Sequence, residues 1–119
     1  MTPILQQMAE ALLKREALEL RELVHDWWRR SDDPTVWAEP VDATDDVLVA
    51  AAALAELLAS QADVAPPAWT AGVGTLSQPF YALAAASRLR SVRELCDRES
   101  PAPLQKRGIL APAGFLQVV

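Results

Sequence analysis

The sequence is poor in the residue types that build disulfides and metal sites. Its 119 residues include one cysteine, Cys96, and one histidine, His25. A single cysteine excludes an internal disulfide and fits a reducing compartment. Transition-metal sites usually gather several cysteines or histidines, so we expect neither a metal nor another cofactor.

Glycine and the aromatic strand formers are also scarce, with four glycines, two phenylalanines and one tyrosine. Gly72 and Gly74 stand too close together for a phosphate-binding fingerprint, and no strand pattern precedes them. Alanine and leucine, which cost least in a helix, are abundant instead. The composition predicts an all-α protein, and the length suits a single domain over residues 1–119.

A long hydrophobic run is missing as well. The longest run, residues 47–55, is well short of the roughly 20 residues that cross a membrane. The first residues carry no basic segment of the kind that begins a secretory signal peptide. We therefore expect a cytoplasmic protein.

Positive charge is in the minority, with 11 basic and 16 acidic residues and a net charge of −5. This balance disfavours non-specific binding to nucleic acids or anionic membranes. Residues 31–46 hold six acids and no base, whereas residues 88–107 hold six bases and three acids. We expect the proline-containing loop at 31–43 to be solvated or to act as an electrostatic docking surface.

Apolar residues recur at helical spacing in three parts of the chain. The pattern predicts three main helices, at about residues 3–30, 45–62 and 79–98. Thr44 is placed to cap the second helix, whose apolar residues lie nearly all round it. Such a helix is either central and buried or shared with a second copy of the chain.

Start and stop signals recur near the C-terminus. Ser100-Pro101 and Gly108 bracket a predicted short fourth helix at 101–107. An apolar strap follows, in which Ile109-Leu110 and Gln117-Val118-Val119 are candidates for short extended segments. Because a free terminus is usually polar, we expect this strap to dock on its own domain or on a partner.

No arrangement of side chains suggests catalysis. Cys96 falls on the apolar stripe of the third predicted helix, where a free cysteine packs as a small hydrophobe. His25 lies near the end of the first predicted helix without the partners that general-base chemistry needs. We therefore expect a protein that is not an enzyme, with a helical enzyme built on His25 as the weaker hypothesis.

Four tryptophans are many for a chain of this length. Tryptophan is enriched at the energetic centres of protein–protein contacts, although these four would also serve to close a thin helical core. Binding to another protein is the leading functional hypothesis. The candidate contact residues are Trp37, Trp69, Phe80, Lys106, Arg107, Phe115 and Leu116.

The alternative hypothesis is a nucleic-acid-binding regulator. Its phosphate contacts would come from the third predicted helix, through Arg88, Arg90, Arg93 and Arg98. Acidic residues lie four positions away from several of these arginines, which is typical of a solvated helix with internal ion pairs. We therefore expect a protein partner rather than a nucleic acid.

A pattern of residues runs from Pro67 to Leu116: Pro67-Ala68-Trp69, Gln78-Pro79-Phe80-Tyr81, Glu99-Ser100-Pro101, Leu104, Arg107, Ile109, Pro112, Phe115 and Leu116. In this pattern the chain resembles the C-terminal block of a family of small, uncharacterised bacterial proteins. This chain has Gly108 where the resemblance leads us to expect Asn. Members of the family are often encoded beside a nucleotidyltransferase-like protein, an arrangement similar to a toxin and its antitoxin. The resemblance implies an antitoxin-like or accessory subunit with such a protein as partner, and it brings no catalytic residue.

Overall fold

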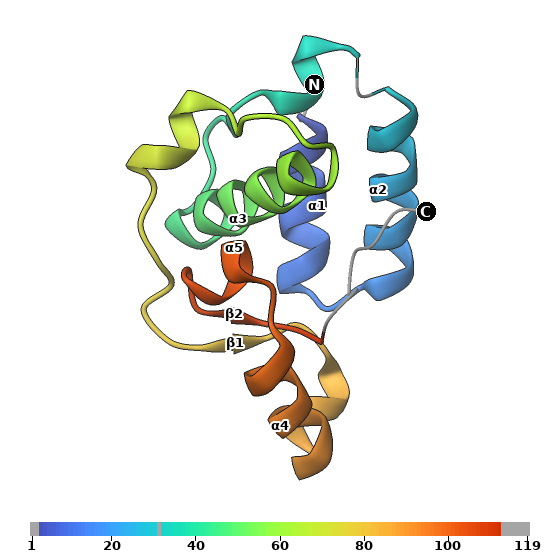
Figure 1. Ribbon diagram of the computed structural model, residues 1–119, viewed down its shortest axis with the longest axis vertical. Helices are drawn as coiled ribbons and strands as arrows, with labels where there is room; N and C mark the ends of the chain where they lie inside the picture. The colour runs from blue at the N-terminus through green and yellow to red at the C-terminus, as the bar shows by residue number, and fades with distance from the viewer. Residues whose placement is uncertain (1–2, 31, 113–119) are drawn as a thin grey trace.

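The computed structural model describes residues 3–30 and 32–112, which form a mostly helical protein (Figure 1). This confirms the predicted all-α class. The elements follow in the order α1 (Ile4–Leu13), α2 (Ala17–Arg29), η1 (Pro34–Trp37), α3 (Asp45–Gln61), η2 (Ala68–Gly72), β1 (Phe80–Tyr81), η3 (Ala84–Ser87), α4 (Arg90–Glu99), α5 (Ala102–Gln105) and β2 (Ile109–Leu110), where η denotes a 3-10 helix.

The second predicted helix is α3, and it is the centre of the fold. The Thr44 side chain accepts a hydrogen bond from the Val47 backbone N–H at 3.3 Å, which confirms the predicted cap. From Val49 to Ala55 every side chain of α3 is buried. α1 packs against one side of this alanine-rich helix, and α5 and η2 pack against it as well (Figure 1).

The first predicted helix, residues 3–30, is divided in the structure into α1 and α2, which lie side by side (Figure 1). Arg15 has a φ of 57°, a left-handed conformation, and the Glu16 N–H bonds back to the Ala11 carbonyl at 2.9 Å. This is a helix-ending turn that usually contains glycine. Arg15 is held there because its guanidinium donates to the Tyr81 carbonyl at 2.9 Å and lies 4.5 Å from the centre of the Phe80 ring.

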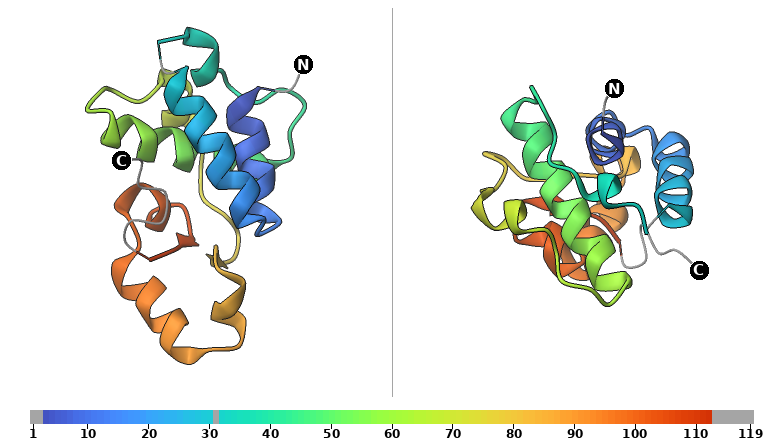
Figure 2. Two further views of the ribbon diagram at one scale, coloured as in Figure 1. Left: turned by 90° about the vertical axis from the view of Figure 1, so that its right-hand side faces the viewer. Right: turned by 90° about the horizontal axis from the view of Figure 1, so that it is seen from above.

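The third predicted helix, residues 79–98, begins only at Arg90 as α4. The preceding residues pair with the C-terminal part of the chain instead, because Phe80 N–H donates to the Gly108 carbonyl at 2.8 Å and Ala82 N–H donates to the Leu110 carbonyl at 2.9 Å. β1 and β2 are therefore parallel strands, as the extended conformation expected for Ile109-Leu110 allows. η3 and α4 extend from this end of the molecule (Figure 2).

Side chains cover both outer edges of the two-stranded sheet. Arg15 binds the Tyr81 carbonyl on the β1 edge. On the β2 edge the Ser100 hydroxyl donates to the Ile109 carbonyl at 3.0 Å and accepts from the Ala111 N–H at 3.4 Å. A two-stranded sheet is marginal alone, so these bonds and the helices around it stabilise the pairing.

The C-terminal strap is described only in part. Ile109 and Ala111 are buried against the core, whereas Phe115, Leu116 and the expected extended segment 117–119 lie outside the described residues. Within residues 3–30 and 32–112, no helix combines the length and the apolar character that crossing a membrane requires.

Gly108 offers a direct test of the turn that leads into β2. Its φ is +85°, while the nearest atom that an added Cβ would meet is the Leu76 Cβ at 3.6 Å, an ordinary contact. We expect Gly108→Ala to lower the free energy of unfolding by about 1 kcal/mol through backbone strain alone. The control Gly72→Ala, with nothing within 4 Å, should change it by less than about 0.5 kcal/mol. Urea unfolding measures both, and equal losses would contradict this account.

Candidate functional site

Three tryptophans tie together the helices at the end of the molecule opposite α4. Trp27 is fully buried, and its indole N–H donates to the Val36 carbonyl at 2.9 Å. Its ring meets Trp37 edge to face, with ring centroids 4.7 Å apart. The Trp69 indole N–H in turn donates to the Trp37 carbonyl at 2.9 Å. The cluster therefore fixes α2, η1 and η2 relative to one another.

Beside this cluster lies a cavity of about 550 Å³, which we call the aromatic groove. It is lined by Trp28, Asp32, Trp37, Ala62, Val64, Ala65 and Pro67. Two of its apolar side chains face solvent, with Trp28 37% and Val64 51% exposed. Its volume falls within the range of sites that hold ligands or partner side chains.

The four indole N–H groups differ in their hydrogen bonding. The indole N–H groups of Trp27 and Trp69 are bonded to carbonyl oxygens. Those of Trp28 and Trp37, which line the groove, have no hydrogen-bond partner among the described residues. No buried side-chain nitrogen or oxygen of the described part lacks a partner, so the N–H of half-buried Trp37 reaches the surface, and Trp28 is itself exposed.

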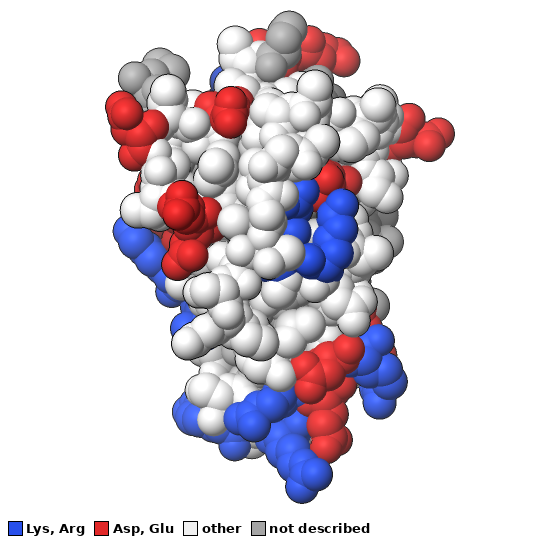
Figure 3. All heavy atoms as spheres, turned by 90° about the vertical axis from the view of Figure 1, so that its left-hand side faces the viewer, with Lys and Arg blue, Asp and Glu red and all other residues white. Residues whose placement is uncertain are grey.

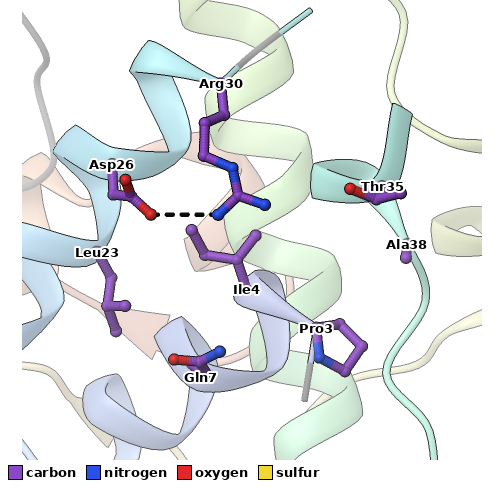
Figure 4. A pocket seen from close by; sticks show the side chains of 8 residues that line it. All are labelled: Pro3, Ile4, Gln7, Leu23, Asp26, Arg30, Thr35 and Ala38. Atoms are coloured by element: carbon purple, nitrogen blue, oxygen red, sulfur yellow. Dashed lines mark hydrogen bonds and ion pairs between the residues drawn. The ribbon is translucent and has the colours of Figure 1, made fainter. Parts of the chain in front are cut away.

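A smaller hollow of about 250 Å³ lies on the other side of α2 (Figure 4). Asp26 and Arg30 line it and form an ion pair at 3.3 Å, and Arg29 approaches Asp26 at 3.6 Å. Trp28 is two residues from both Asp26 and Arg30, which places it on the opposite side of the helix. Both arginines at the end of α2 are thus paired with Asp26, away from the aromatic groove.

The charge around the aromatic groove is acidic. Asp32 is the one charged residue among those of the described part that line it, and exposed Asp63 stands between the lining residues Ala62 and Val64. Asp33 caps η1, and the hydrogen bond from the Thr35 backbone N–H holds the pKa of Asp33 below its usual range. Figure 3 shows acidic side chains mainly over the upper half and most basic ones towards the α4 end.

The predicted contact residues that the structure describes lie in three places: at the aromatic groove, at the two-stranded sheet and beside Glu56 of α3. Trp37 lines the aromatic groove and Trp69 supports it, whereas Phe80 lies half-buried beneath Arg15 at the sheet. Phe115 and Leu116 lie outside the described residues. The prediction missed Trp28. Adjacent residues on a helix point about 100° apart, so one of the two tryptophans could be expected to turn outward, but spacing alone did not show which.

Lys106 and Arg107 both bind Glu56 of α3, but only one of them is exposed. Lys106 reaches Glu56 from the surface at 3.2 Å. Arg107 is 4% exposed, and its Nε donates to Glu56 at 2.9 Å. Its terminal nitrogens donate to the carbonyls of Thr70, Val73 and Gly74 at 2.9, 2.6 and 2.8 Å. Arg107 therefore belongs to the interior of the fold and is not available to a partner.

The side chains with chemical reactivity lie apart from the aromatic groove. Cys96 is buried on α4, as the apolar stripe predicted, and burial raises the pKa of its thiol, which keeps it in the unreactive form. His25 is exposed on α2. In the part of the chain that the structure describes, no three histidine, cysteine or acidic side chains are placed to hold a metal ion.

The chain matches no protein-family model, no curated protein and no solved structure.

Removing the Arg107 side chain tests its role in the fold. We expect Arg107→Ala to lower the free energy of unfolding by about 3–5 kcal/mol, because Glu56 and three carbonyls lose a buried partner. The control Lys106→Ala removes the exposed partner of the same carboxylate and should cost less than about 1 kcal/mol. Chemical denaturation measures both free energies of unfolding. Similar losses in the two variants would show that the buried Arg107 guanidinium stabilises the fold no more than Lys106 does.

Low pH should weaken the interaction of Glu56 with Arg107 and Lys106. Burial alone would raise the pKa of Glu56, but hydrogen bonds from Arg107 and Lys106 outweigh it and hold the pKa below the ordinary 4.5. The contribution of this carboxylate is therefore present above that pH and is lost as the pH falls through the folded-state pKa. We expect the difference in unfolding free energy between the wild type and Glu56→Gln to shrink between about pH 6 and about pH 3. A difference that stays constant over this range would contradict the pairing.

Proposed function

We propose that this protein is a small protein-binding module, an antitoxin-like or accessory subunit of a two-protein pair, and that the aromatic groove is its contact surface. The observation that carries the proposal is the exposure of Trp28 and Val64 beside a cavity that Trp28, Trp37 and Val64 line together. Partly exposed tryptophan beside a pocket is typical of the residues that dominate protein interfaces.

Charge indicates what kind of partner fits. Asp32 lines the groove and Asp63 stands at its edge, while Arg29 and Arg30 are paired with Asp26 elsewhere. A basic segment would meet complementary charge there, which increases the association rate and selects against acidic partners. The partner we propose therefore presents apolar side chains within a basic segment.

The resemblance of residues 67–116 to small bacterial proteins supports the same role. It suggests a nucleotidyltransferase-like protein as the partner, encoded beside this chain. Pro67 is both the first residue of that resemblance and part of the groove wall. We propose that such a neighbouring protein is the first candidate to examine.

The arginines of α4 offer less support for nucleic-acid binding. Arg90 pairs with Glu94 at 3.0 Å, and Arg98 approaches Glu99 at 3.7 Å. Arg93 donates to the Ala86 carbonyl at 3.2 Å. The two ion pairs offset part of the positive charge that phosphate contacts would need, so a protein partner remains the preferred proposal.

Co-expression with the neighbouring gene product tests this function. We expect a complex of defined stoichiometry, and we expect Trp28→Ala and Val64→Ser each to weaken it by about tenfold or more. The control is Leu18→Ser, which removes a side chain that is 73% exposed on the same helix as Trp28 but does not line the groove. Calorimetry of the purified pair measures the three affinities.

The proposal fails if the chain remains a monomer without a specific protein partner. A complex that tolerates both groove variants would place the contact elsewhere on the surface. Circular dichroism of each variant separates a lost contact from a lost fold.

A further inference from the structure

We propose that the aromatic groove recognises an arginine side chain of its partner, with the guanidinium held between the Trp28 indole and the Asp32 carboxylate. This inference rests on the proposed protein-binding function and names the chemistry of the anchor. It depends on three features of the groove: its two tryptophan side chains, its acidic side chain and the size of its apolar remainder.

Two indole side chains, those of Trp28 and Trp37, line the same cavity. The face of an indole ring attracts a cation more strongly than any other side-chain ring does. A guanidinium is planar and weakly hydrated, so it stacks on such a face at a smaller desolvation cost than an ammonium group. The edge-to-face contact with buried Trp27 holds the Trp37 ring in place.

The acid in the groove is Asp32, an exposed residue. Asp32 makes no ion pair or hydrogen bond within the described residues. The nearest arginines in sequence, Arg29 and Arg30, are paired with Asp26, which faces the other hollow (Figure 4). A carboxylate beside an indole offers a guanidinium both a charged hydrogen-bond acceptor and a stacking surface.

The rest of the groove is apolar and too large for a guanidinium alone. Ala62, Val64, Ala65 and Pro67 complete its wall, and its volume is about 550 Å³. The methylene stem of an arginine packs well on such a surface, and the space beyond it accommodates an apolar neighbour from the same segment. The ligand class is therefore a short peptide segment in which arginine stands beside an apolar residue.

Selection of a random peptide library displayed on phage against the full chain tests this inference, with counter-selection on Trp28→Ala. We expect the selected peptides to share an arginine beside an apolar residue. In a synthetic copy of a selected peptide, Arg→Gln should weaken binding by about tenfold, and Arg→Lys should weaken it by less.

A double-mutant cycle then assigns the contact. Asp32→Asn should weaken the arginine peptide several-fold and leave the weaker binding of its Arg→Gln form unchanged. Asp42→Asn is the matched control, because it removes the same charge from an exposed acid that does not line the groove. Fluorescence anisotropy of the labelled peptides measures all of these affinities.

Peptides that depend on Trp28 but contain no arginine would overturn this inference and leave the proposed function standing. Equal effects of Asp32→Asn on both peptide forms would also overturn it. If no peptide distinguishes the wild type from Trp28→Ala, the inference fails, and the effect of the same variant on the natural complex decides the proposed function separately.

Discussion

The fold depends on the buried guanidinium of Arg107. An irregular loop that packs against a core must find donors for its carbonyl groups, and a buried charge must find a partner of opposite sign. Arg107 meets both needs, because it binds Glu56 in the middle of α3 and three carbonyls between Thr70 and Gly74. The C-terminal part of the chain is thereby joined to the central helix and to the loop after η2. Since η2 follows Pro67 directly, the same interaction holds one wall of the aromatic groove in place.

The turn after Arg107 leads the chain directly into the two-stranded sheet. Gly108 takes up the left-handed conformation, and the following residues pair with Phe80 and Tyr81. Arg15 reaches the same strand from the turn between α1 and α2, so a strained position in the N-terminal half is supported by a contact with the C-terminal half. Local conformations that are costly alone persist here because distant parts of the chain hold them.

The sequence-based predictions succeeded where a feature depends on residues close together in the chain, and they failed where it depends on residues far apart. The start of α3 is fixed by Thr44 three residues from its hydrogen-bond donor, so the helix was predicted almost to its ends. The break at Arg15 was missed because apolar spacing continues across it and no glycine marks it. Arg107 was predicted to lie at a contact surface. Its burial could not be predicted, because its partner Glu56 is 51 residues away in sequence. In the candidate site Trp37 was predicted, whereas Trp28 was not, because spacing alone did not show which of two adjacent tryptophans turns outward.

The two sides of α2 show how a weak interaction can shape a binding surface. Exposed ion pairs such as Asp26–Arg30 contribute about 0.3–0.5 kcal/mol, so they matter little to the stability of this chain. Their effect is on the distribution of charge. Arg29 and Arg30 pair with Asp26, whereas Asp32, which lines the groove together with Trp28, has no ion pair within the described part of the chain. An indole N–H that remains solvated costs the fold nothing, yet it is ready to bond when a partner displaces that water. The groove is therefore apolar and acidic, because the nearest arginines in sequence, Arg29 and Arg30, are paired with Asp26 on the other side of α2.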